Sequence, residues 1–253
     1  MAKRDHIVEF LNRKLEIERY SDMCINGLQV EGREDVSSVA VAVDAGETVI
    51  ARAIELGCEM LVVHHGLFWD KPFPVVGPSR RKLSSLLNCG LNLYAVHLPL
   101  DAHAEVGNNF CLARIIGLEQ LRPAINYRGT PIGCIGRNTK RLSLGQIEAT
   151  LGRLPGARIP FVTLEFGKSV PENVCVVTGA GADSLTSFEK EAFDTLITGE
   201  PRQFAYHYAE ENRLNVICAG HYATETVGVQ ELGKLLEREL GLCWELIDVP
   251  TGI

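Results

Sequence analysis

Two adjacent histidines follow an apolar run in the first third of the chain. Residues 60–63 read Met-Leu-Val-Val, and His64, His65 and Gly66 come next. Such a run is typical of a buried strand, in which successive side chains point to opposite sides. One histidine at this place could be a hydrogen-bonded core residue. Two in succession at a strand end indicate a site in which each imidazole faces a different metal ion.

Two further histidines are each followed by a carboxylate four residues later. His97 precedes Asp101, and His221 precedes Glu225, in both cases after an apolar run that predicts a strand. His221 and Glu225 lie at a predicted helix start, where residues four apart share one face. Imidazole and carboxylate donors together suit Zn, Fe or Mn, and suit Mg less well because of the imidazoles.

The predicted ligand set combines these residues: His64, His65, Asp101, His221 and Glu225. Five ligands are more than one open catalytic site takes, and they suit two divalent ions about 3.5–4 Å apart. Glu225 is the predicted bridge because it is the longest carboxylate of the set. Two such ions lower the pKa of a bridging water toward about 7, which predicts a hydrolase that uses an activated water.

Other polar residues near these motifs are weaker candidates. His97 is the predicted catalytic residue, which passes protons, although it could also be a sixth ligand, a supporting residue or a structural histidine. His103 and Glu200 are further candidates for the site. The turn at residues 179–181, Gly-Ala-Gly, resembles a phosphate nest but lacks the spacing of a P-loop, and a tight turn explains it as well.

Two neighbouring segments could contact a nucleotide. Phe68 and Trp69 follow the histidine pair and could stack on a planar ring, pack the loop or contact another subunit. Arg80, Arg81 and Lys82 could bind phosphates, and a solvated helix start explains them equally well.

Composition restricts the class of protein. The 253 residues are 46% apolar and 23% charged, as in a soluble globular protein, and the formal net charge is −7. An acidic chain gives no strong signal for nucleic-acid binding. There is no apolar run long enough for a membrane span and no signal peptide. None of the eight cysteines forms a CxxC pair, which favours reduced core cysteines in a cytoplasmic protein over a cysteine zinc site.

Strands and helices alternate along the chain, which predicts an α/β fold with mainly parallel sheets. The predicted strands cover residues 39–43, 61–63, 91–96, 132–135, 161–166, 174–177, 195–197, 214–218 and 244–249. The predicted helices cover residues 7–15, 44–56, 81–87, 108–116, 144–151, 184–192 and 203–212, and a long one ends near residue 239. Residues 26–32 are predicted as a turn-rich entry.

The strand series of residues 39–97 resembles that of residues 174–221, which indicates a duplication. We therefore predict two similar α/β domains, residues 1–125 and 126–253, with a boundary somewhere in residues 118–170. Ligands of parallel α/β sheets bind beyond the carboxyl ends of the strands, where the histidines and carboxylates lie. Two such halves facing each other would place these side chains in one cleft.

Six motifs are spread along nearly the whole chain in a definite order. They are NGLQVEG at residues 26–32, VVHHGLFW at 62–69, HLPLDAH at 97–103, GNN at 107–109, ITGE at 197–200 and GHYATE at 220–225. Together they resemble the Nif-like family known as type 2 GTP cyclohydrolase I, in particular its short bacterial YbgI form.

The resemblance implies a fold, a cofactor and an activity. It implies two α/β domains with a di-metal site in the cleft between them, assembled as a homo-hexameric toroid. The metal ligands that it implies match the five residues of the predicted set. The activity that it implies is opening of the guanine imidazole ring of GTP with loss of formate. The small-molecule substrate would then be a purine nucleotide.

Two other functions fit the same ligand set. One is a non-enzymatic metal-binding hexamer that acts as a scaffold or adaptor. The other is a di-metal phosphatase or esterase, because the ligands determine the activated water and not its target. Availability in the cell, rather than the donor set, would select the metal.

Overall fold

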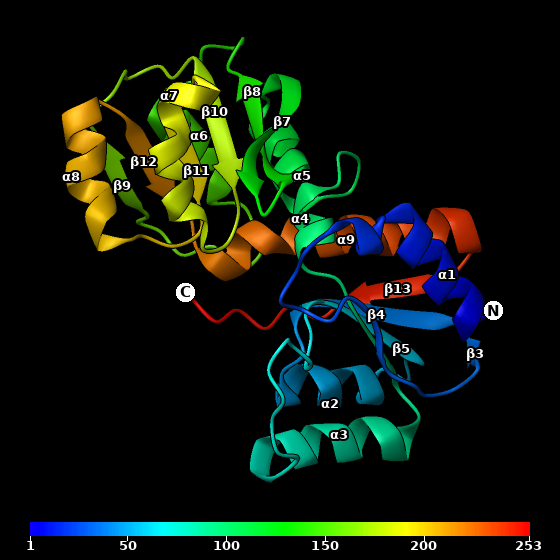
Figure 1. Ribbon diagram of the computed structural model, residues 1–253. Helices are drawn as coiled ribbons and strands as arrows, with labels where there is room; N and C mark the ends of the chain where they lie inside the picture. Colours follow the sequence, from blue (N-terminus) through cyan, green and yellow to red (C-terminus); the bar gives the residue numbers. More distant parts are fainter. The chain divides into compact units, whose positions relative to one another are not determined.

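The computed structural model describes all 253 residues, which form two compact units (Figure 1). Unit 1 comprises Met1–Leu100 and Val229–Val249, and unit 2 comprises Asp101–Gly228 and Pro250–Ile253. This division differs from the two contiguous halves expected from the sequence. The chain leaves unit 1 within the short helix α4 (Leu98–Ala102) and returns to it within the long helix α9 (His221–Leu240).

Unit 1 contains a five-stranded sheet. Its strands, in spatial order, are β13 (Cys243–Leu246), β4 (Ser38–Asp44), β5 (Met60–His65), β6 (Asn92–Ala95) and β2 (Gly27–Val30). The first four are parallel, and β2 pairs antiparallel with β6. The segment at residues 26–32 was expected to be a turn-rich entry, but most of it is this edge strand.

Helices cover both faces of this sheet (Figure 1). α2 (Glu47–Glu55) and α3 (Gly77–Cys89) lie on one face, and α1 (Arg4–Lys14) lies on the other with the later turns of α9. Every residue of β6 and all but the last of β5 are buried. Parallel strands covered on both faces are continuous apolar runs, so their sequences could be read as strands. Two short strands, β1 (Ala2–Lys3) and β3 (Asp35–Val36), and the 3-10 helix η1 (Ile17–Arg19) complete the unit.

Unit 2 contains a six-stranded sheet. Its strands, in spatial order, are β7 (Glu119–Tyr127), β8 (Thr130–Arg137), β10 (Asn173–Val177), β11 (Thr195–Thr198), β12 (Asn215–Cys218) and β9 (Val162–Glu165). β10, β11 and β12 are parallel, and β8 and β9 flank them antiparallel. Its helices are α5 (Asn108–Ile116), α6 (Leu144–Leu151), η2 (Gly181–Ser187), α7 (Phe188–Glu191) and α8 (Gln203–Asn212). The helix expected at residues 184–192 is instead the 3-10 helix η2 followed by one α-helical turn.

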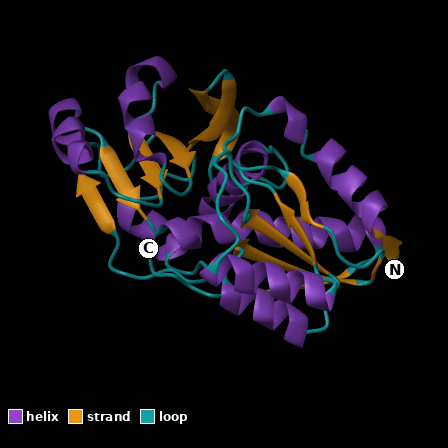
Figure 2. Ribbon diagram, turned by 60° about the horizontal axis from the view of Figure 1, so that its bottom comes forward, coloured by secondary structure: helices purple, strands orange, loops and turns teal.

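Four strands of each sheet repeat one topology, although each sheet belongs to its own unit. In unit 1 an antiparallel strand, β2, lies beside the third of three parallel strands, in the order β4-β5-β6-β2. In unit 2, β9 lies in the same place, in the order β10-β11-β12-β9. In both units the antiparallel strand precedes the three parallel strands in the chain, which supports the predicted duplication. Figure 2 shows the helices packed around the strands, and the α/β class is confirmed.

All eight cysteines are free thiols, and six of them are buried. Burial raises the pKa of the Cys218 thiol to about 11, so this residue behaves as a small core side chain. No helix in the structure combines the length and the apolar composition that a membrane span requires.

Candidate metal centre

Three histidines of unit 1 converge at the carboxyl ends of two neighbouring strands. His64 and His65 end β5, and His97 follows β6 by two residues. The ring centroids of His64 and His65 are 4.6 Å apart, and that of His97 lies 5.1 Å from His64 and 5.7 Å from His65. One nitrogen from each ring lies within 4.8 Å of the other two, a spacing suited to metal binding. The strand-end argument thus correctly brings these three residues together.

Each of the three rings is held at its Nδ1 atom by an oxygen atom of the same unit. The contacts are His64 to the Val96 carbonyl (3.0 Å), His65 to the Asp44 carboxylate (2.8 Å) and His97 to the Asp22 carboxylate (2.9 Å). Because these oxygens accept a hydrogen bond from Nδ1, the neutral ring carries its lone pair on Nε2. This is the arrangement of histidines that ligate metals, whose second nitrogen donates to a carboxylate or carbonyl.

Asp22 is a residue of this site that the sequence did not reveal. Its buried carboxylate accepts hydrogen bonds from the backbone amides of Cys24 (3.1 Å) and Leu98 (2.9 Å), as well as from Asn26 and His97. Burial raises the pKa of Asp22, but the hydrogen bond from His97 and the other donors outweigh it and lower the pKa to about 2. The carboxylate is therefore ionised at neutral pH and fixes the His97 ring.

The NGLQ motif at residues 26–29, which leads into β2, braces both histidine loops. The Asn26 side-chain oxygen accepts from the His97 amide (2.8 Å). The Gln29 side-chain oxygen accepts from the Leu67 amide (2.7 Å), just after the histidine pair. Gly66 is required here because a Cβ atom at this position would overlap the Gln29 side chain. Motifs far apart in sequence are thus parts of one hydrogen-bonded frame.

Unit 2 contains a second set of candidate ligands, which is rich in carboxylates. His221 and Glu225 lie on the first turns of α9, with His221 Nε2 3.1 Å from Glu225 Oε2. Glu200, after β11, accepts a hydrogen bond from His221 Nδ1. Glu200 was a weak candidate from sequence, and it orients this ring as Asp44 orients His65.

Asp101 is the second buried carboxylate of this unit that the sequence singled out. Asn108 Nδ2 donates to Asp101 Oδ1 (2.9 Å), and the Thr178 hydroxyl donates to the same oxygen (3.3 Å). Asn108 belongs to the GNN motif, so that motif supports a predicted ligand. These donors hold the carboxylate in place, and an ionised carboxylate is a metal ligand.

The electrostatics of this set centre on His221. Burial lowers the pKa of His221, but the hydrogen bond and charge of Glu225, followed by those of Glu200, outweigh it and raise the pKa to about 9. Glu225 is only 3% exposed and Asp101 8%. Without a metal ion, the protonated His221 balances the charge of Glu225 and Glu200.

Gly179 gives the Glu225 carboxylate the space that it occupies. Its φ angle is +62°, and a Cβ atom at this position would overlap Glu225 Oε1. The Gly179 amide donates to the Thr224 hydroxyl (3.1 Å). Of the two interpretations of the Gly-Ala-Gly segment, this geometry favours the tight turn over the phosphate nest.

The remaining candidates have structural explanations or line the histidine cluster. Phe68 stacks on Phe73 with the ring centroids 5.6 Å apart, which fits loop packing. The Trp69 ring lies edge-on to His97, with 5.2 Å between the centroids. His103 accepts hydrogen bonds from two nearby backbone amides and stabilises a turn.

The fold and these donors define an α/β protein with candidate groups for binding metal ions. The model of the Duf34/NIF3 family (NGG1p interacting factor 3) matches residues 2–250, and the chain belongs to this family. The resemblance drawn from the six motifs is thereby confirmed.

Relatives and solved structures agree with this assignment. The chain is 43% identical over 251 residues to the GTP cyclohydrolase 1 type 2 homolog of Pyrococcus horikoshii, with 99% of each chain covered. It is similar to the crystal structure of TTHA1606 from Thermus thermophilus, with a TM-score of 0.90, 44% identity, and coverage of 99% of this chain and 100% of the other. Protein ybgI, described as of unknown function, has a TM-score of 0.90 at 35% identity over the same shares.

Proposed function

We propose that the protein is a dinuclear-metal-dependent hydrolase that acts on a purine nucleotide. The ligands of the two divalent ions, Zn, Fe or Mn, would be His64, His65, Asp101, His221 and Glu225. The observation that carries the proposal is the orientation of the histidines: each has its Nδ1 atom bonded to an acceptor, as in known metal sites. Core packing alone does not require an acceptor on Nδ1 of all three imidazoles, two of which contact carboxylates there.

The donor set fits the proposed ions. Imidazole nitrogens and carboxylate oxygens are ligands of Zn, Fe and Mn, and the negative charge of Asp101 and Glu225 would offset the charge of two cations. Glu225 is the proposed bridging ligand, since Gly179 leaves room for its carboxylate. Such ions, when bound, activate water as a nucleophile at neutral pH.

His97 is the proposed proton-transfer residue. Asp22 holds its Nδ1 atom at 2.9 Å, so its Nε2 atom can accept a proton and return it. The ionised Asp22 stabilises the imidazolium that forms after proton uptake. The Trp69 ring lies edge-on beside the His97 ring, with 5.2 Å between the centroids.

The relatives' name supports the choice of substrate class. They are called homologues of a GTP cyclohydrolase, so a purine nucleotide is the first substrate to test. The proposed reaction opens the imidazole ring of guanine and releases formate. We also propose a homohexamer in the cytoplasm, where its eight free thiols would stay reduced.

Metal content per chain is the first test. Untagged protein is loaded with Zn, Fe or Mn, desalted and measured by ICP-MS, beside His65→Ala and Glu225→Ala. We expect about two ions per chain in the wild type and a loss in both variants. The matched control is His207→Ala, which removes an exposed histidine in α8. No retained metal in the wild type, or equal losses in the control, would contradict the proposal.

Turnover is the second test. Metal-loaded protein is incubated with GTP, and formate is measured, with Glu225→Ala as the inactive reference. Formate release that depends on Glu225 supports the cyclohydrolase reaction. Release of p-nitrophenol from phosphate or ester substrates instead would identify a di-metal phosphatase or esterase. Full metal content without any turnover would favour a metal-binding scaffold.

A further inference from the structure

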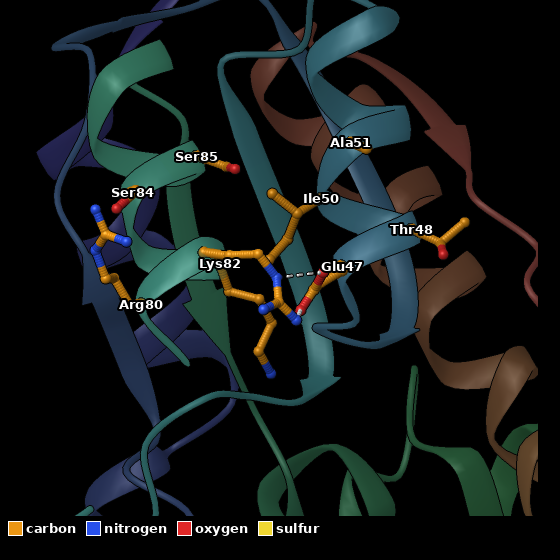
Figure 3. A pocket seen from close by; sticks show the side chains of 9 residues that line it. Glu47, Thr48, Ile50, Ala51, Arg80, Lys82, Ser84 and Ser85 are labelled. Carbon is orange, nitrogen blue, oxygen red and sulfur yellow. Dashed lines mark hydrogen bonds and ion pairs between the residues drawn. The ribbon is translucent and has the colours of Figure 1, made fainter. Parts of the chain in front are cut away.

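A cavity of unit 1 lies between the two helices that cover one face of its sheet. It has a volume of about 620 Å³ and is lined by residues of α2 and α3 (Figure 3). Small-molecule sites typically measure about 300–1,000 Å³, so the space suits a nucleotide-sized ligand. In Figure 3, Glu47 of α2 and Lys82 of α3 lie on facing sides of this space.

The lining of this cavity is basic, although the chain as a whole is acidic. Arg80, Arg81 and Lys82 line it in succession, and Glu47 is its only acidic side chain. Its formal charge is therefore +2 (three cations and one anion), against −7 for the whole chain. The three cations follow the first turn of α3, which contains no acidic residue. Cations near a helix N-terminus are unfavourable by themselves, whereas an anion there would be stabilised by both the side chains and the helix dipole.

The chain connects this cavity to the histidine cluster of the same unit. α2 begins three residues after Asp44, which holds His65, and α3 follows the loop that leaves His65. Lys82 Nζ donates to the Ala45 carbonyl at 3.5 Å, directly beside Asp44. The helix N-termini therefore lie at the same end of the parallel sheet as the histidines, which is where α/β sheets bind ligands.

We propose that this cavity binds the phosphate chain of a nucleotide. Arg80, Arg81 and Lys82 would supply the charge, and the hydroxyl groups of Thr48, Ser84 and Ser85 would supply neutral hydrogen-bond donors. That this nucleotide is the substrate rests on the proposed function; that a phosphate chain binds here does not.

Glu47 distinguishes this proposal from a purely structural role of the charges. It accepts two hydrogen bonds from Arg81, at 2.7 and 3.2 Å, and both side chains are about half exposed. An exposed pair of this kind contributes little to stability. An incoming phosphate would compete with Glu47 for Arg81. Removing the carboxylate should therefore strengthen phosphate binding, whereas removing a cation should weaken it.

The test measures binding to metal-free protein, so that a metal ion cannot hold the phosphates. Protein stripped with EDTA is titrated calorimetrically with GTP, inorganic tripolyphosphate and guanosine at low ionic strength. We expect GTP and tripolyphosphate to bind and guanosine to bind at least tenfold more weakly. Lys82→Gln and Arg81→Gln should each lower the affinity for both anions about tenfold, which corresponds to the loss of one charged hydrogen bond. Glu47→Gln should raise the affinity for both anions.

The matched control is Arg52→Gln, which removes an exposed cation of α2 that pairs with Glu55 and does not line the cavity. Its affinity should equal that of the wild type. Three results would overturn the proposal. They are equal binding of guanosine and GTP, equal losses of anion affinity in Arg52→Gln and Lys82→Gln, and weaker anion binding in Glu47→Gln. No binding of either anion to well-folded protein would overturn it as well.

The outcome is separable from that of the metal proposal. If ICP-MS finds no metal while tripolyphosphate binding depends on Lys82, the hydrolase proposal fails and the phosphate site stands. If metal is retained and Lys82→Gln leaves the binding of both anions unchanged, the phosphate site fails and the metal site stands.

Discussion

The two units offer candidate ligands of different character. Unit 1 presents three imidazoles at strand ends, and two of them are held at Nδ1 by carboxylates. Unit 2 presents one imidazole, His221, with Glu200 on one ring nitrogen and Glu225 on the other. The rings of both sets are held at Nδ1 by hydrogen bonds, and Glu225 Oε2 lies 3.1 Å from Nε2 of His221, the nitrogen that a metal would take. Because Glu225 and Glu200 raise the pKa of His221 to about 9, a proton competes with a metal ion for this ring.

Gly179→Ala should have the largest effect, because it would disturb the ligand set of unit 2 and leave that of unit 1 unchanged. The alanine would have to adopt the φ angle of +62° at this position, and its Cβ atom would displace the Glu225 carboxylate. We expect a loss of stability of about 2–3 kcal/mol and loss of the metal proposed to bind Glu225, while the histidines of unit 1 stay in place. Urea unfolding and ICP-MS measure the two effects.

Gly57→Ala is the matched control for that variant. Gly57 has a similar φ of +73°, but a Cβ atom there meets nothing within 4 Å. It should lose only the part of the stability that backbone strain accounts for, about 1 kcal/mol, and keep full metal content. Equal metal loss in both variants would show that Gly179 has no special relation to the ligand set.

The second prediction concerns the stability of the metal-free protein at alkaline pH. The folded-state pKa of His221 is raised from 6.5 to about 9. Its contribution to stability is therefore fully present below pH 6.5 and declines as the pH rises through 9. We expect a loss on the order of 2–3 kcal/mol across this window, measured by urea unfolding between pH 6 and 9.5 in EDTA. In Glu225→Gln the decline should be much smaller, and an unchanged decline would contradict the assignment.

The third prediction tests unit 1 at acid pH. The pKa of Asp22 is lowered from 3.8 to about 2, so its contribution is present above pH 3.8 and is lost as the pH falls through 2. We expect Asp22→Asn to be less stable than the wild type by on the order of 2 kcal/mol at pH 7. The difference should shrink between pH 4 and pH 2, as followed by urea unfolding. Asp70→Asn, in the loop after the histidines, is a control that should match the wild type.

The sequence predicted local elements well and long-range contacts poorly. The bounds of α5, α6 and α8 agree with the helices expected from apolar spacing, because that spacing is a local property. β7 was not predicted, since most of its residues are exposed and no apolar alternation marks it. The division into units could not be predicted, because it depends on β13 pairing with β4, about 200 residues earlier in the chain.

The same distinction applies to the site. The candidate ligands could be recognised because they follow apolar runs or stand four residues apart, as His221 and Glu225 do. Asp44 directly follows the predicted strand at residues 39–43, so the same argument could have found it. Asp22 carries no such signal: it lies outside any helix or strand, and its contact with His97 joins residues 75 positions apart. The proposed ligand set itself stays a prediction until metal is measured.

The smallest expected effect comes from replacing the carboxylates that hold a histidine in each unit, Asp44 on His65 and Glu200 on His221. Asp44→Asn and Glu200→Gln each replace a carboxylate on Nδ1 by an amide that can still accept the hydrogen bond. Loss of such a partner typically lowers metal affinity 10–100-fold, through weaker ligand basicity. In unit 2, however, Glu200 also raises the pKa of His221, so its removal weakens the competing proton.

For Glu200→Gln the two effects oppose each other. At pH 7 we therefore expect Asp44→Asn to weaken Zn binding about tenfold and Glu200→Gln to weaken it by a smaller factor, measured by competition with a chelator. Above pH 9, where most of the His221 rings are deprotonated, the offset shrinks and the affinity losses of the two variants should approach each other. A ratio between the variants that stays constant from pH 7 to pH 9.5 would show that proton competition does not distinguish the two units.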